Sequence, residues 1–387
     1  MTRLDRLLGD VSTGRPGPTI IVTAGVHGNE PAGTVALARV FATLADRKLP
    51  LRGRLIGLAG NLGALARNQR FVARDLNRGW IVDRIAALLA HDPSEDRDED
   101  AEQRALLERF RPVLAAADRP VVFLDLHSTS AGGSPFTIIA DTLRNRRVAF
   151  ALPAPVILGL EETIEGTLSS WLDDLGHVAI VFEGGQNQDP TTIDRHEAAV
   201  WLTLERVGGL TRSEIPDFAR HVTTIADSTR GIARVVEIRG RHAIVPEDRF
   251  EMNPGYANFQ SIRRGEVLAH DLRGDVCAWE NGVILMPLYQ KQGDDGFFAA
   301  RAVSRFWLGL SRVLRLLRAD RILPFLPGVH RHASEPDQLV VDPSVARFIV
   351  RQIFHLFGFR MMKSENGKRV FWRRRPEFRG LRSIDGE

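Results

Sequence analysis

The sequence has little cysteine or tyrosine and lacks long apolar stretches. Cys277 is the only cysteine among 387 residues, so no disulfide can form within the chain, and a lone thiol fits a reducing compartment. No uncharged stretch reaches the roughly 20 residues that cross a bilayer. The first residues also lack the apolar core of a secretory signal. We therefore expect a cytoplasmic protein.

Several functional motifs are also missing. No Gly-x-Gly-x-x-Gly or P-loop pattern is present, so a nucleotide cofactor is not implied, and there is no Gly-x-Ser-x-Gly elbow of a serine hydrolase. The composition is that of an ordinary globular protein, with 44% hydrophobic and 26% charged residues. The length allows two or more domains, each with a core of its own.

Strand-like and helix-like patterns alternate over the first two hundred residues. Apolar runs predict strands at 19–24, 55–59, 121–124, 136–140 and 178–182, and helical spacing predicts helices at 31–45 and 104–117. This alternation indicates an α/β fold with a central sheet and helices on both faces. Functional residues in such folds lie beyond the carboxyl ends of the strands.

Two of these strand ends carry histidine. The run 19–24 is followed by Gly25-Val26-His27-Gly28-Asn29-Glu30, and the run 121–124 is followed by Asp125-Leu126-His127. Two imidazoles and one carboxylate suit a catalytic Zn²⁺, which keeps a fourth position for water. We therefore interpret His27, Glu30 and His127 as three ligands of one zinc ion. Asp125 either orients a ligand from behind or is a structural strand-end aspartate.

Two further segments supply charged groups. The segment 68–80 contains Arg70, Arg74 and Arg78 together with two asparagines, and arginine can grip a carboxylate with two hydrogen bonds. The run 178–182 delivers Glu183 into a glycine pair, where a glutamate is a candidate general base.

Four motifs occur in order: Gly-x-His-Gly-Asn-Glu, Arg-x-x-x-x-Asp-Leu-Asn-Arg, Asp-Leu-His-Ser-Thr and Glu-Gly-Gly. Together they resemble the succinylglutamate desuccinylase/aspartoacylase family of the zinc carboxypeptidase clan, over roughly residues 15 to 298. The resemblance implies a zinc carboxypeptidase-like fold with a mixed central sheet. It also implies hydrolysis of an amide in a small N-acyl amino acid.

The resemblance assigns roles to residues of the motifs. His27, Glu30 and His127 match the family's zinc ligands, Glu183 matches the residue that activates water, and Arg70 matches the arginine that polarises the carbonyl. Asn77 and Arg78 match the pair that holds a substrate carboxylate, and Tyr289 resembles a tyrosine near the substrate, although packing explains it equally well. We find no equivalent, before Glu183, of the extra arginine with which aspartoacylase reads a second carboxylate. Acetylaspartate is therefore not the expected substrate.

Two acidic clusters have alternative interpretations. The run 92–100 is best explained as a solvated loop or a helix start. Glu161, Glu162 and Glu165 belong either to a solvated face or to a pocket wall that selects a cationic or amine-bearing substrate.

The chain divides into three parts by pattern. Residues 1–212 are the expected zinc-hydrolase domain. Residues 213–300, with short strand-like runs at 234–238, 243–245, 267–269 and 282–286, are expected to form a small β domain that covers the site. Residues 301–387 are expected to form a basic, partly helical extension, with helices within 301–319 and 344–357.

This extension holds 18 Lys and Arg against 8 Asp and Glu, whereas the whole chain has a net charge of only +4. Aromatic residues between its basic residues could bind nucleic acid or an anionic membrane surface. We instead expect an appendage that packs on the enzyme or joins copies into a homo-oligomer.

Three functions stay open at this point. The first is a zinc-dependent deacylase that acts on a small N-acyl amino acid. The second is a zinc carboxypeptidase-like peptidase, and the third is a binding protein with a vestigial metal site.

Overall fold

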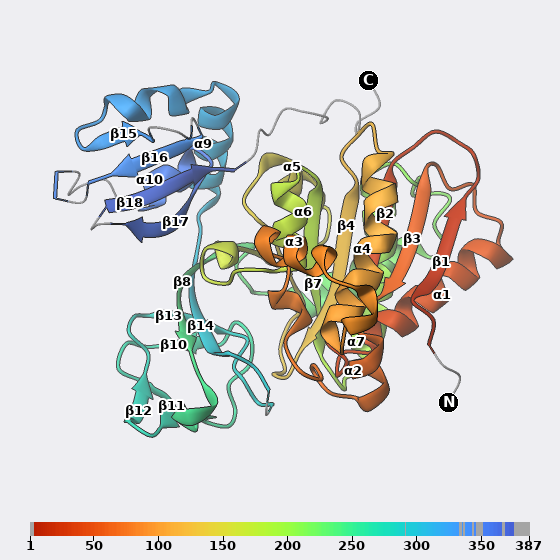
Figure 1. Cartoon of the computed structure of the whole chain (residues 1–387), viewed down its shortest axis with the longest axis horizontal. Coiled ribbons are helices and arrows are strands. Elements are labelled where there is room, and N and C mark those ends of the chain that lie inside the picture. The colour runs from red at the N-terminus through yellow and green to blue at the C-terminus, as the bar shows by residue number, and fades with distance from the viewer. Residues whose placement is uncertain are drawn as a thin grey trace.

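The fold is built around one large mixed sheet (Figure 1). The computed structural model describes residues 4–290, 292–332, 335, 337–342, 344–345, 351–365 and 368–374. The sheet has the strand order β1-β3-β2-β4-β7-β5-β6-β8-β14-β13-β10. Its strands are β1 (Leu7–Ser12), β2 (Thr19–Ala24), β3 (Arg54–Ala59), β4 (Val122–Thr129), β5 (Phe136–Ile138), β6 (Val156–Leu158), β7 (Val178–Gln186), β8 (Val235–Ala243), β10 (Ser261–Ile262), β13 (Gly282–Leu285) and β14 (Asp295–Ala302).

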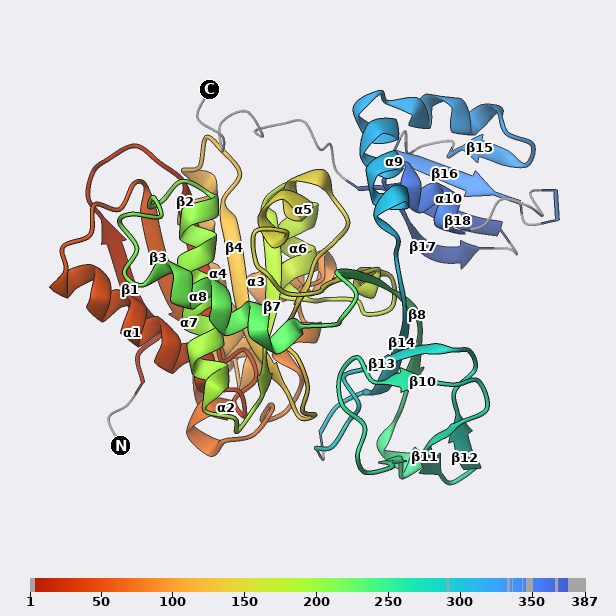
Figure 2. The ribbon, with the colours of Figure 1, turned by 180° about the vertical axis from the view of Figure 1, so that it is seen from behind.

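Helices cover both faces of this sheet (Figures 1 and 2). The helices of one face are α1 (Ala32–Asp46), α5 (Leu143–Ala149), α7 (Thr191–Arg206) and α8 (Phe218–Ala226). Those of the other face are α3 (Val82–Ala90), α4 (Glu99–Ala115) and α6 (Leu168–Asp174). The short helices are α2 (Leu62–Arg67), η1 (Leu76–Arg78), η2 (Pro93–Glu95), η3 (Leu160–Glu162), η4 (Asp227–Thr229) and η5 (Pro246–Asp248). The expected α/β fold is thus confirmed.

The central strands β2, β3, β4 and β7 run parallel and are buried on both faces, which explains their continuous apolar runs. Leu124 and Ile180 belong to the core under α1 and α7, whereas Phe123 and Ala179 belong to the core under α4 and α6. Because side chains alternate along a strand, residues at odd positions of β4 and β7 face α4 and α6.

The expected elements of the first two hundred residues are present with small differences in their ends. The structure confirms all five expected strands and both expected helices. The helix α4 begins at Glu99, five residues before the expected start, because the acidic residues of the run 92–100 occupy its first turn. Negative side chains are favoured at that end of a helix.

Only some strands of the segment 213–300 form a sheet of their own. Its strands β8, β10, β13 and β14 continue the large sheet, while β9 (Glu251–Met252), β11 (Val267–Asp271) and β12 (Gly274–Cys277) form a separate three-stranded sheet. The expected strand at 243–245 is absent as such, since residue 243 is the end of β8.

The last described part of the chain contains more than helices. The helices α9 (Arg305–Leu316), η6 (Ala319–Phe325) and α10 (Arg351–Leu356) lie beside a four-stranded antiparallel sheet. Its strands are β15 (Val329–Arg331), β16 (Gln338–Val341), β17 (Phe359–Glu365) and β18 (Lys368–Arg373). The extension is thus partly helical, as expected, but its four strands were not predicted. Val370 and Phe371, in the basic and aromatic segment of β18, are buried in this small sheet.

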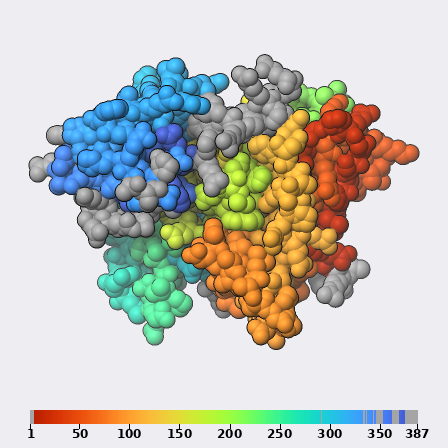
Figure 3. Space-filling view, turned by 45° about the horizontal axis from the view of Figure 1, so that its top comes forward, coloured from red at the N-terminus to blue at the C-terminus, as the bar shows by residue number. Residues whose placement is uncertain are grey.

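The helix α9 exposes Arg305 and Arg312 but buries Arg315. Ser311 and Arg315 are its buried residues, whereas Phe306 is 68% exposed. Arg315 is turned inward because it pairs with Asp141 of the main body, at 2.7 Å. Figure 3 shows the blue atoms of this C-terminal part against the yellow-green atoms of the middle of the chain. Within the described residues, no helix is long and apolar enough to cross a membrane.

Candidate metal centre and cavity

Two loops at neighbouring strand ends bring the candidate ligands together. His27 and Glu30 lie in the turn between β2 and α1, and His127 lies near the end of β4, which pairs with β2. The turn packs so closely on the backbone of Ala64 that a Cβ on Gly28 would lie 2.0 Å from it. Glycine in this motif is therefore required by close backbone approach.

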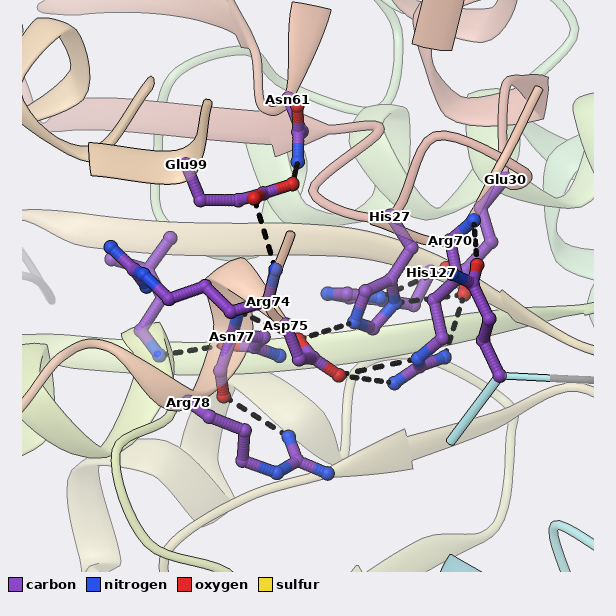
Figure 4. Close-up of polar contacts among 12 residues, drawn as sticks. His27, Glu30, Asn61, Arg70, Arg74, Asp75, Asn77, Arg78, Glu99 and His127 are labelled. Carbon is purple, nitrogen blue, oxygen red and sulfur yellow. Dashed lines mark hydrogen bonds and ion pairs between the residues drawn. The ribbon is translucent and has the colours of Figure 1, made fainter. Parts of the chain in front are cut away.

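The three side chains form one buried group (Figure 4). Glu30 lies between the imidazoles, with Oε1 at 2.8 Å from His27 Nδ1 and Oε2 at 3.0 Å from His127 Nδ1. One ligand atom from each residue lies within 4.8 Å of the others, so the group could hold a metal ion. The structure thus brings together all three residues singled out from the sequence.

The outer nitrogen of each imidazole meets a carboxylate. His27 Nε2 lies 3.2 Å from Asp75 Oδ1, and His127 Nε2 lies 3.0 Å from Asp125 Oδ2. Thr23 in turn donates a hydrogen bond to Asp125 Oδ1 at 2.6 Å. Such partners fix the ring orientation and leave both Nδ1 atoms facing Glu30, which is the usual arrangement behind metal-binding histidines.

Charges within this group shift its protonation. Burial raises the pKa of Glu30, but His27 and His127 outweigh this effect, and the pKa ends well below its usual range. Burial lowers the pKa of His127, but Asp125 and Glu30 raise it well above its usual value. The carboxylate of Glu30 is therefore ionised, as a metal ligand must be.

Glu183 lies beside His127 on the adjacent strand. The two residues are direct partners in the parallel pair of β4 and β7, so their side chains point to the same face of the sheet. Burial, with smaller contributions from Glu30 and Asp125, raises the pKa of Glu183 to about 8 against the opposing effects of His127 and Arg70. Its Oε2 is buried without a hydrogen-bond partner among the described residues. A carboxyl group with such a pKa is suited to exchange protons near neutral pH.

Arg70 reaches the same centre from the loop after α2. Its guanidinium donates to Asp75 Oδ2 at 2.9 Å, and one amino nitrogen lies 3.6 Å from Glu30 Oε1. Asp75 therefore holds both His27 and Arg70 (Figure 4). The sequence motif contained Asp75, but its role was missed because the motif alone does not show what it contacts.

Asn77 and Arg78 lie in η1, at the wall of the same cavity. Asn77 Oδ1 accepts a hydrogen bond from the backbone of Leu168 at 2.8 Å, which leaves its amide NH₂ as the donor end. Arg78 donates to Asp295 at 2.8 Å. Asp295 was not singled out from the sequence, because it lies over two hundred residues from Arg78.

Tyr289 is not brought to the cavity. Its hydroxyl donates to the carbonyl of Asn253 at 2.8 Å and accepts from the backbone N–H of Tyr256 at 2.9 Å. These bonds tie two loops together, and Tyr289 is absent from the described residues that line the cavity.

Two supporting residues were not predicted to act at the site. Glu99, from the acidic run, is buried and accepts hydrogen bonds from the backbone N–H groups of Val72, Ala73 and Arg74 (Figure 4). It thereby shapes the loop that carries Arg70. His196 on α7 hydrogen-bonds to the carbonyl of His127 at 2.8 Å, and burial lowers its pKa to about 4.

The cavity has a volume of about 130 Å³. His27, Glu30, His127, Glu183 and Arg70 all line one end of it. Residues after β13 close it from another side, and Gln292 there accepts a hydrogen bond from the backbone of Arg70 at 3.1 Å. The fold and this set of side chains define an α/β protein with a candidate metal centre at the carboxyl ends of parallel strands.

Comparison with known proteins shows to which family the chain is similar. A family model described as the succinylglutamate desuccinylase/aspartoacylase catalytic domain matches residues 16–203. The chain therefore belongs to the succinylglutamate desuccinylase/aspartoacylase family, as its four motifs predicted.

Individual relatives match parts of the chain. A succinylglutamate desuccinylase of Pseudomonas paraeruginosa is 32% identical over 117 residues, which are 30% of this chain and 32% of the relative. One of Burkholderia thailandensis is 42% identical over 60 residues, which are 16% of this chain and 17% of the relative. The chain thus matches a third or less of the length of these curated relatives.

Solved structures match over a longer part of the chain. Succinylglutamate desuccinylase of Vibrio cholerae superposes with a TM-score of 0.56 and 18% identity, over 76% of this chain and 85% of that one. Murine aminoacylase 3 superposes with a TM-score of 0.51 and 20% identity, over 75% of this chain and 97% of that one. At these identities the likeness is one of fold.

Proposed function

We propose that this protein hydrolyses the amide bond of a small N-acyl amino acid, with one zinc ion held by His27, Glu30 and His127. The observation that supports this most strongly is the meeting of these three side chains with Glu183 and Arg70 at one end of a single cavity. The membership in a family of deacylases supports the reaction type.

The residues present fit zinc. The inner atoms are two imidazole Nδ1 nitrogens and an ionised carboxylate, which is a donor set of catalytic zinc sites. Asp75 and Asp125 occupy the outer nitrogens, so each ring would donate outward and bind inward. When bound, zinc polarises a carbonyl group and lowers the pKa of a water molecule to about 7.

The chain's own residues supply the remaining steps. Glu183 takes a proton from the attacking water and later gives it to the departing nitrogen. The water oxygen forms a bond to the carbonyl carbon, the carbon–nitrogen bond breaks, and the products are a carboxylate and an amine. Arg70 stabilises the negative charge that develops on the carbonyl oxygen. The amide NH₂ of Asn77 and the guanidinium of Arg78 hold a carboxylate of the substrate.

Two variants test these roles separately. Glu183→Gln should keep one zinc ion per chain but lower kcat by at least about 100-fold, because no group accepts the proton. His127→Ala should lose zinc, because a ligand is missing. Zinc content by atomic absorption and rates on a panel of N-acyl amino acids measure both. A Glu183→Gln variant with the wild-type rate would remove Glu183 from the mechanism.

The same panel separates the alternatives. A carboxypeptidase-like peptidase would prefer longer peptides, added to that panel, over the single N-acyl amino acids. A binding protein with a vestigial site would take up zinc and hydrolyse none of the compounds.

A further inference from the structure

The lining of the cavity offers few free positive charges. Arg70 and Arg78 are the lysine or arginine side chains among the described lining residues. Each already pairs with a carboxylate, Arg70 with Asp75 at 2.9 Å and Arg78 with Asp295 at 2.8 Å. The carboxylates that line the cavity are Glu30, Glu161, Glu183 and Asp295. If Arg78 holds one carboxylate of the substrate and Arg70 the carbonyl oxygen, no other lysine or arginine among the described lining residues can hold a second carboxylate.

One of these carboxylates lies away from the histidines. Glu161 belongs to η3, which follows β6, and β6 is the third strand from β4 in the order β4-β7-β5-β6. Three strand spacings of about 4.8 Å separate the two strands by roughly 14 Å. We name the end lined by His27, Glu30 and His127 the histidine end, and the end lined by Leu160, Glu161 and Ile164 the glutamate end.

Glu161 is fixed from behind. Its side chain is only 4% exposed, and its Oε1 accepts hydrogen bonds from Arg374 at 2.6 and 3.2 Å. Arg374 is itself buried and also donates to the carbonyl of Phe359 at 2.8 Å. The C-terminal part of the chain therefore sets the orientation of a side chain that lines the cavity.

The second oxygen of Glu161 is not used. Oε2 is buried and has no hydrogen-bond partner among the described residues. A buried carboxylate oxygen normally has a partner, because leaving it without one is costly. Leu160 and Ile164, on the same turn, give this end apolar walls. Apolar walls with one free anionic acceptor suit an alkyl stem that ends in a cation.

We propose that the glutamate end binds the cationic side chain of the leaving amino acid, so that the preferred substrates are N-acyl derivatives of basic amino acids. This inference rests on the proposed function, since it names the substrate class of the same site. An ammonium or guanidinium group donates to Glu161 Oε2, while the methylene stem lies against Leu160 and Ile164. A carboxylate in the same place would bring acceptor oxygens against Glu161 Oε2 with no donor between them, because Arg374 bonds to Oε1.

Three amino acids of similar length that differ in terminal charge test the proposal. They are L-lysine, L-norleucine and L-2-aminoadipate, used as Nα-acetyl derivatives for hydrolysis and as free amino acids for calorimetric titration of the zinc-loaded protein. We expect the lysine compound to exceed the aminoadipate compound at least about tenfold in kcat/KM and in affinity, a factor that corresponds to about 1.4 kcal/mol. The free amino acids make the binding test independent of the acyl group.

Glu161→Gln should reduce this preference, measured as the ratio of the lysine to the aminoadipate compound, at least about tenfold. The matched control is Glu165→Gln, because Glu165 is exposed on the same segment and does not line the cavity. Lys291→Gln is made in parallel to test whether this lysine binds a carboxylate of the substrate. Lys291 lies outside the described residues but follows Gln290, which lines the cavity.

The outcomes separate this inference from the proposed function. Equal kcat/KM and affinity for the three compounds overturn the inference. A preference for the aminoadipate compound also overturns it, even if Lys291→Gln abolishes that preference for aminoadipate. If the derivatives are hydrolysed without preference, the proposed function stands alone. If free lysine binds with the expected preference but no derivative is hydrolysed, the pocket assignment stands and the deacylase function fails. No binding and no hydrolysis overturn both.

Discussion

The histidine end and the glutamate end of the cavity are supported by different parts of the chain. His27 and His127 are oriented by Asp75 and Asp125, which all lie within the residues matched by the family. Glu161 also lies within them, but its partner Arg374 is close to the end of the described chain. The candidate metal ligands and their partners thus come from the family domain alone, whereas the orientation of Glu161 depends on a residue outside that domain.

The largest expected effect comes from removing the charge of Asp141, which follows Ala140 of the cavity wall. Asp141 is buried and pairs with Arg146 of α5 and Arg315 of α9, at 2.8 and 2.7 Å. Asp141→Asn removes a buried negative charge that faces the guanidinium groups of two buried arginines. We expect it to lower the free energy of unfolding by about 3–5 kcal/mol, measured by urea denaturation.

A matched control is Asp174→Asn. Asp174 also pairs with an arginine of the C-terminal part, Arg360, at 2.7 Å, but its side chain is 51% exposed. Although Arg360 is buried, solvent screens the carboxylate of Asp174, so losing its charge should cost less stability than losing the charge of Asp141. Equal stability of the two variants would mean that the buried carboxylate of Asp141 contributes no more to folding than the half-exposed carboxylate of Asp174.

The histidine end could be predicted from sequence because each of its residues follows a recognisable strand. The runs before His27, His127 and Glu183 are buried on both faces, so their composition is strongly apolar and their ends are sharp. The family motifs then fix which polar residues follow. Asp75 was within such a motif, but only the fold shows that it contacts His27 and Arg70.

The glutamate end could not be predicted with the same certainty. Glu161 lies on a short turn with other glutamates, and the same pattern fits a solvated face. What decides between the two is Arg374, which lies 213 residues later in the chain. The C-terminal strands were missed for a related reason, since the basic residues of β18 obscure the apolar pair Val370 and Phe371.

An intermediate effect is expected at the histidine end. Asp75→Asn keeps an acceptor for the backbone of Asn77 but removes the negative charge that holds His27 and Arg70. Loss of such an outer partner typically lowers metal affinity or activity about 10–100-fold. Competition with a chromogenic chelator measures zinc affinity without relying on turnover. Asp10→Asn is the control, because Asp10 pairs with Arg54 at the surface, and an equal loss in both variants would contradict the role of Asp75.

The smallest expected effect is a pH dependence at the glutamate end. His355 lies 2.8 Å from Glu162 and 2.7 Å from Glu237. Burial lowers its pKa, but these two carboxylates outweigh burial and the opposing charge of Arg374, and the pKa is raised above its usual value of 6.5. Protonated His355 therefore stabilises the folded protein fully below that value, and the contribution is lost as pH rises through the raised pKa. The difference in melting temperature between wild type and His355→Gln should narrow from about pH 6 to about pH 9. Groups common to both proteins cancel in this difference, so a gap that stays constant over this range would show that His355 is not charged in the folded protein.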